Sequence, residues 1–97
     1  MTFEHFYDSL IASQPPLELT QALAGLWWDA KGDWKLAHER AQEDESPAGS
    51  WLHAYLHRKE GDAFNAGYWY RRARKPAAKG GLEQEWAEIA GALLAGG

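Results

Sequence analysis

Two segments of this 97-residue chain carry the same residues at the same spacing, 29 residues apart. The two copies are Gly32-Asp33…Ala37…Pro47 and Gly61-Asp62…Ala66…Pro76. Glycine adopts the left-handed conformation that ends a helix, and the aspartate after it can cap the next helix. An alanine lets two helices approach closely, and a proline stops the second helix from continuing. The repeat therefore predicts a helix–turn–helix unit that is used twice.

Hydrophobic spacing extends this prediction to the rest of the chain. We expect helical hairpins at about 17–44 and 50–74, separated by a loop whose centre is Pro47. Apolar residues at helical spacing also predict terminal helices at about 2–13 and 82–95. Their stripes are Phe3, Phe6, Tyr7 and Leu10 in the first helix, and Leu82, Trp86, Ile89 and Leu93 in the last.

No segment shows the period-two alternation of a β-strand over a useful length. The chain is 45% hydrophobic and 25% charged, which is typical of a globular domain. We therefore expect one all-α domain over residues 1–97, a compact bundle of about six helices. The terminal helices would cover the two hairpins, because such units cannot bury their apolar faces alone.

The spacing within each copy resembles the tetratricopeptide repeat. The second copy follows that pattern well, as Gly61-Asp62…Ala66…Tyr70…Ala73…Pro76. The first copy departs from it at Ala41 and Asp44, although Gly25 and Trp28 match the small and aromatic positions upstream. Both copies are shorter than the family's usual repeat. The resemblance covers about residues 17–78 and implies helical hairpins, but it says little about function.

A second resemblance rests on two neighbouring stretches, His57-Arg58-Lys59-Glu60-Gly61-Asp62 and Tyr68-Trp69-Tyr70-Arg71-Arg72-Ala73. Together they resemble a small family of helical-hairpin domains. That resemblance carries no activity over to this chain.

Composition excludes several classes of protein. The chain contains no cysteine, so it forms no disulfide, thiolate metal site or cysteine nucleophile. No run approaches the roughly 18 apolar residues of a membrane span. The first residues lack the basic and apolar regions of a signal peptide. We therefore expect a soluble, cytoplasmic protein.

Charge is distributed unevenly along the chain. The net charge is −4, yet residues 58–79 contain seven basic residues against Glu60 and Asp62. This asymmetry fits an anionic partner, self-association through opposite ends, or simply solvated helix faces. The overall acidity and the absence of a recognised nucleic-acid-binding motif argue against nucleic acid as the partner.

Histidines and carboxylates are the candidate catalytic or metal-binding groups of the chain. His53 and His57 are four residues apart, a spacing found in zinc sites. Ala54 occupies the place of the glutamate in the His-Glu-x-x-His motif, and the sequence places no third ligand. A helical wheel puts this pair on the polar side of its helix. The sequence thus predicts no metal and no cofactor.

Signs of catalysis are equally sparse. His38-Glu39, Asp33 and the acidic run 43–45 could act in acid–base chemistry, but nothing in the sequence marks them as buried. No serine lies in a nucleophile elbow, and no glycine-rich phosphate loop occurs. The sequence leans against an enzyme and assigns no catalytic residue.

The segment around 63–74 is the strongest candidate for a binding surface. Aromatic residues fall on more than one face of this predicted helix, as expected for two-sided packing or for a displayed surface. Aromatic and arginine side chains are enriched among interface hot spots. The candidate partner-binding residues are Arg58, Asn65, Tyr68, Trp69, Arg71 and Arg72.

A second concentration of aromatics surrounds the first hairpin turn. We expect Trp27 in the core, whereas Trp28 and Trp34 could lie either in the core or at its rim.

The sequence supports three functional hypotheses. The leading one is a protein- or peptide-binding module. The alternative is a small-molecule or metal site, with or without catalysis, that has Trp28, His53 and His57 as candidate ligand-binding residues. The third is a structural protein that forms homo-oligomers.

Overall fold

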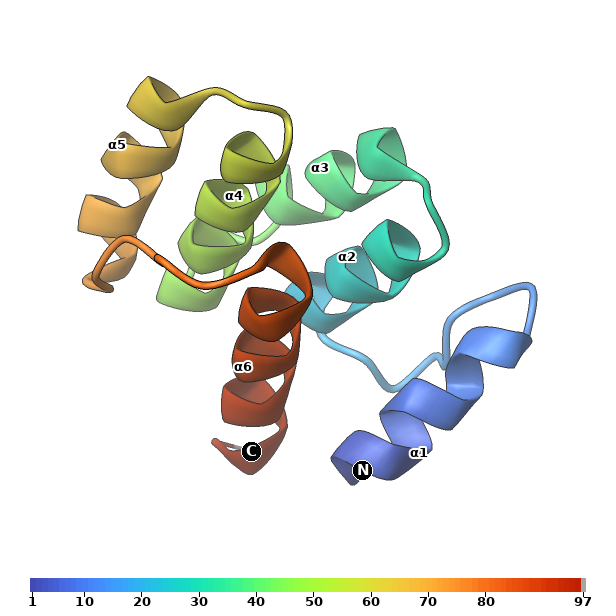
Figure 1. The fold of residues 1–97 in the computed structure, drawn as a ribbon. Helices are drawn as coiled ribbons and strands as arrows, with labels where there is room; N and C mark the ends of the chain where they lie inside the picture. The colour runs from blue at the N-terminus through green and yellow to red at the C-terminus, as the bar shows by residue number, and fades with distance from the viewer. Residues whose placement is uncertain (97) are drawn as a thin grey trace.

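The computed structural model describes residues 1–96. Within that range the chain forms six α-helices and one 3-10 turn, and the all-α prediction is confirmed (Figure 1). The elements are α1 (Phe3–Asp8), η1 (Ser9–Ile11), α2 (Gln21–Ala30), α3 (Trp34–Gln42), α4 (Pro47–Lys59), α5 (Ala63–Ala73) and α6 (Leu82–Ala95).

The two glycine–aspartate corners have the same geometry. Gly32 and Gly61 have φ angles of +88° and +89°, a conformation that glycine adopts without strain. The backbone N–H of each following aspartate donates to the carbonyl five residues back, at 2.9 Å in both corners. Each aspartate side chain then accepts the N–H three residues ahead, from Leu36 or Asn65. One helix is thus terminated and the next begun by a two-residue signal.

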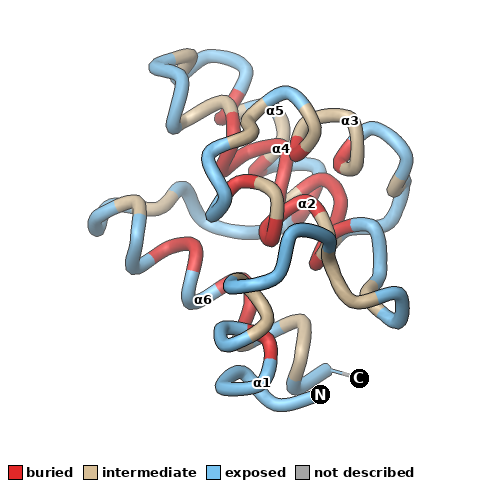
Figure 2. The backbone as a smooth tube through the Cα atoms, turned by 90° about the vertical axis from the view of Figure 1, so that its right-hand side faces the viewer, coloured by how far each residue is buried: buried red, intermediate tan, exposed pale blue. Residues whose placement is uncertain are grey.

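Helix α4 lies at the centre of the molecule. It packs against α2, α3, α5 and α6, and α2–α3 and α4–α5 form the two hairpins. Figure 2 shows buried segments on every helix, with long ones on α2 and α4. The fully buried large side chains include Phe6, Trp27, Leu52, Leu56 and Ile89. Trp27 therefore belongs to the core, as predicted.

Helix α6 covers the face made by α2 and α4. Trp86 and Ile89 are buried there, and the indole N–H of Trp86 donates to the backbone oxygen of Leu26 at 2.8 Å. Phe6 on α1 stacks on Trp86, with ring centroids 5.7 Å apart. The terminal helices thus close the core, and the Cα radius of gyration is 12.2 Å, near the roughly 12.5 Å usual for this length.

Several helix boundaries differ from the predicted ones. Helix α4 begins at Pro47 rather than Ser50, because proline is well suited to the first turn of a helix. Helix α2 begins only at Gln21, where the Thr20 hydroxyl accepts the N–H of Leu23. The N-terminal helix is α-helical only to Asp8 and continues as η1, and helix α3 ends at Gln42. Helix α6 matches the predicted range.

Alanine substitution at the corner glycines tests the shared geometry. A Cβ added at Gly32 or Gly61 meets no atom within 4 Å, so the cost is purely conformational. We expect Gly32→Ala and Gly61→Ala each to lower the free energy of unfolding by about 1 kcal/mol. Gly91, inside α6, also has open space around it. Gly91→Ala should therefore stabilise the protein by up to about 1 kcal/mol. Urea denaturation measures the free energy of unfolding of all three variants. If the corner variants were stabilised like Gly91→Ala, or if Gly91→Ala were destabilised like them, the proposed role of the corners would be contradicted.

Candidate functional site

The outer face of α5 carries exposed aromatic and basic side chains. Phe64 and Tyr68 are 85% and 44% exposed and lie four residues apart. Arg72 continues the row: its guanidinium lies 5.9 Å from the Tyr68 ring centroid and 5.1 Å from that of Trp69. It also donates to the Tyr68 hydroxyl at 3.3 Å. Helix α5 packs mainly on α4, and the row of Phe64, Tyr68 and Arg72 is exposed to solvent.

Cations surround this row. Arg71, Arg72, Arg74 and Lys75 are all exposed. Within residues 1–96, none of them forms an ion pair with a carboxylate. Lys75 instead lies 4.4 Å from the ring centroid of Trp51. Within these residues the positive charge is therefore not held in ion pairs, although Asp44 and Glu45 line the same small cavity as Arg72.

The other predicted partner-binding residues have mixed surroundings. Asn65 is exposed, but its amide donates to Asp62 at 2.7 Å. Trp69 is half-buried and stacks on the His53 ring, with centroids 4.0 Å apart. Arg58 lies elsewhere: it donates to Glu85 at 2.9 Å and to the backbone oxygen of Gly80. Five of the six candidates thus share α5, whereas Arg58 links α4 to α6.

Two buried carboxylates, neither of them predicted from the sequence, hold the helices together. Asp29 accepts the Tyr55 hydroxyl at 2.7 Å and the Lys59 ammonium at 2.9 Å. Glu85 likewise accepts from the Tyr70 hydroxyl and from Arg58. Burial, followed by the hydrogen bond to its carboxylate, raises the pKa of each tyrosine well above its usual value. Both tyrosines therefore stay protonated and act as structural donors.

The histidines form a cluster that the sequence predicts only in part. His53 and His57 on α4 are joined by His38 on α3, and one ring nitrogen from each lies within 4.8 Å of the others. These three residues could hold a metal ion, and His57 also belongs to a second such group, with Glu60 and Asp62. The expectation that His53 lies on a polar face is wrong: it is only 5% exposed, because α3 and α5 pack on both sides of α4.

Aromatic rings enclose this cluster. Trp34 stacks on His38 with centroids 4.8 Å apart and an interplanar angle of 9°. Trp69 stacks in the same way on His53 at an angle of 10°. Trp28, predicted from the sequence as a ligand-binding residue together with His53 and His57, instead contacts Trp27 edge-to-face at 5.0 Å. Trp34, not Trp28, is therefore the tryptophan of the first hairpin that borders the cluster.

Burial and mutual repulsion keep two of these imidazoles neutral. Burial lowers the pKa of His53 to about 4, and the nearby His38, His57 and Arg72 contribute to this shift. Burial and His57 also lower the pKa of His38, although Glu60 and Glu39 oppose this shift. The imidazoles of His38 and His53 are therefore uncharged at neutral pH.

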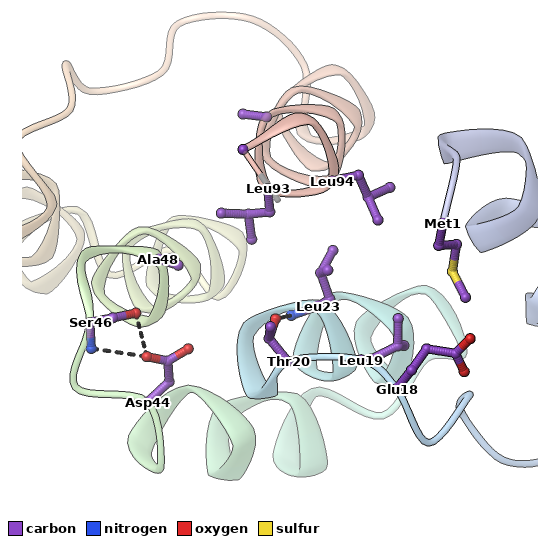
Figure 3. Close-up of a pocket in the computed structure, with 12 residues that line it drawn as sticks. Met1, Glu18, Leu19, Thr20, Leu23, Asp44, Ser46, Ala48, Leu93 and Leu94 are labelled. Atoms are coloured by element: carbon purple, nitrogen blue, oxygen red, sulfur yellow. Dashed lines mark hydrogen bonds between the residues drawn. The ribbon is translucent and has the colours of Figure 1, made fainter.

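Three surface cavities are alternative sites. The groove in Figure 3, about 410 Å³, has aliphatic walls from Leu19 and Leu23 on one side and Leu93 and Leu94 on the other. Asp44, at its edge, already accepts from the backbone N–H of Ser46 at 2.9 Å. A second cavity of about 430 Å³ lies over the Asp29 network. The third, about 190 Å³, borders His53, Trp69 and Arg72 and so adjoins the histidine cluster.

Comparisons with family models, curated proteins and solved structures produced no match to this chain. The tetratricopeptide resemblance therefore stays a prediction. In residues 1–96, every helix is too short or too polar to cross a membrane.

The low pKa of His53 predicts a loss of stability in acid. The unfolded chain binds a proton at this residue below about pH 6.5, whereas the folded metal-free chain does so only near pH 4. The free energy of unfolding must therefore fall as the pH drops between these values. His53→Phe keeps a ring against Trp69 but removes the proton site. Relative to this variant, the free energy of unfolding of the wild type should fall by about 3 kcal/mol between pH 7 and pH 4.

Chemical denaturation of the metal-free protein at several pH values measures this difference. His5→Phe, at the exposed start of α1, is the control for the effect of replacing any histidine by phenylalanine. If wild type and His53→Phe lose stability in parallel, His53 is not held neutral by the fold.

Proposed function

We propose that this domain binds an acidic segment of a protein partner through the outer face of α5. The observation that carries the proposal is the row of Phe64, Tyr68 and Arg72, exposed beside further cations that have no carboxylate partner within residues 1–96. Exposed aromatics can anchor a partner in the centre of an interface, and arginines pair with carboxylates in a bidentate geometry.

Helix α6 favours this face over the opposite one. The face of the hairpins made by α2 and α4 is already covered by Trp86 and Ile89 of α6. A peptide could bind there only by displacing these buried side chains. The outer face of α5 needs no such rearrangement, because its side chains are already in solvent.

Crosslinking followed by reconstitution tests the proposal. A photoreactive amino acid at position 64 should trap the partner in cells that produce the protein. The purified partner should then bind with an affinity that falls as salt is raised, because salt screens exposed charges. Phe64→Ala and Arg72→Glu should each weaken binding about tenfold or more, since truncating an interface anchor costs over 1 kcal/mol.

Tyr7→Ala is the matched control, because Tyr7 is an exposed aromatic on α1, 58% exposed. It should leave binding unchanged. Undiminished binding by Phe64→Ala and Arg72→Glu would refute the proposal. If nucleic acid is what binds this face, or if the only partner is a second copy of the chain, the proposed partner class is wrong.

A further inference from the structure

We propose that His38, His53 and His57 bind a divalent transition-metal ion, a function separate from the partner surface on α5. One ring nitrogen of each lies within 4.8 Å of the other two. In a tetrahedral site with metal–nitrogen bonds of about 2.0–2.1 Å, ligand nitrogens are about 3.3 Å apart. Each ring therefore needs to move by about 1 Å at most to close around an ion.

The two helices bring the rings together from different directions. His53 and His57 are one turn apart on α4, and their rings are nearly parallel at 16°. The ring of His38, from α3, is nearly perpendicular to both, at 84° and 80°, with centroids 4.9 and 5.4 Å away. The ring of His38 therefore lies across the other two, and the three rings do not form one stack.

Protein groups leave most of these nitrogens free. Within residues 1–96, neither His38 nor His53 makes a side-chain hydrogen bond, and Nδ1 of His53 is buried without a partner. A buried polar atom without a partner costs free energy, and such atoms are rare in folded proteins. Coordination through this nitrogen would remove that cost. This observation is independent of the distances and points to a missing ligand.

His57 has a carboxylate behind its ring. Its Nδ1 lies 2.7 Å from Oε2 of Glu60, an arrangement in which Nδ1–H donates to the carboxylate. The lone pair is then on Nε2, where it can coordinate an ion. Histidines that bind metals commonly donate their other N–H to a carboxylate, which fixes the tautomer and strengthens the ligand.

The surroundings hold the remaining rings in place. Trp34 and Trp69 stack on His38 and His53, so that rotation of either imidazole would break an aromatic contact. Ligands that are held in position before binding lose less conformational entropy when the ion arrives. The alternative explanation is that these five rings are only an aromatic packing cluster.

The ligand set limits the class of ion. Three neutral imidazoles suit zinc, nickel, copper or cobalt, whereas calcium and magnesium prefer oxygen ligands. Three protein ligands leave at least one position for water or another molecule. The 190 Å³ cavity beside His53 gives solvent a route to this side of the cluster.

Titration of the chelator-treated full chain with Co²⁺ or Zn²⁺ alone tests the proposal. We expect one ion per chain, visible d–d absorption from Co²⁺, and its loss on adding Zn²⁺. In a histidine-resolved NMR spectrum, Zn²⁺ should shift the ring signals of His38, His53 and His57. The signals of His5 should stay unchanged, since it lies outside the cluster.

Single substitutions assign the ligands. His38→Ala and His57→Gln should each reduce the affinity for Zn²⁺ at least tenfold, whereas His5→Ala should have no effect. Glu60→Gln should reduce it by about 10- to 100-fold, as removal of such supporting carboxylates usually does. Circular dichroism of each metal-free variant checks that it is folded.

Two results would overturn the metal site. One is the absence of any stoichiometric binding by the folded wild type at a pH of about 7.5, which is above the usual pKa of histidine. The other is unchanged affinity in both folded variants, His38→Ala and His57→Gln. Phe64→Ala should leave Zn²⁺ binding intact, so failure of the partner proposal and failure of the metal proposal can be told apart.

Discussion

The position of α4 constrains the rest of the structure. Four helices pack around it, so that seven of its thirteen residues are buried. The polar side chains near the centre of this helix have little access to solvent, and several of them bond to partners inside the protein. Tyr55 finds Asp29, and Arg58 finds Glu85. His53 makes no such hydrogen bond and lies among Trp69, His38 and His57, with Arg72 nearby.

Much of the fold could be predicted from local sequence signals. Local residues determine the Gly32-Asp33 and Gly61-Asp62 corners and the apolar stripe of α6. The residues that cause each of these elements to form therefore lie within one short stretch of sequence. The start of α4 at Pro47 is not predicted, because the repeat pattern treats this proline only as the end of the preceding helix. Proline ends one helix and begins another equally well, and the choice depends on the residues after it.

The candidate sites could be predicted only in part, for a related reason. Tyr68, Trp69 and Arg72 share one helix, so their grouping can be derived from sequence. His38 joins His53 and His57 only because α3 packs on α4, a contact between segments that sequence spacing does not encode. A helical wheel places the histidine pair on a polar face because it assumes one buried side, whereas α4 is enclosed on several sides. Trp69 and Arg72 connect the two sites, since both border the cavity next to His53.

The two carboxylate–tyrosine–cation networks have a consequence for folding kinetics. Their hydrogen bonds join residues 15 to 30 positions apart, between helices that must already be in place. Contacts of this kind stabilise the chain only after the entropy of loop closure has been lost. We therefore expect them to form after the folding barrier has been crossed. Interactions that are absent from the transition state slow unfolding and leave the folding rate almost unchanged. Asp29 and Glu85 would then govern how long a folded molecule persists, more than how quickly it forms.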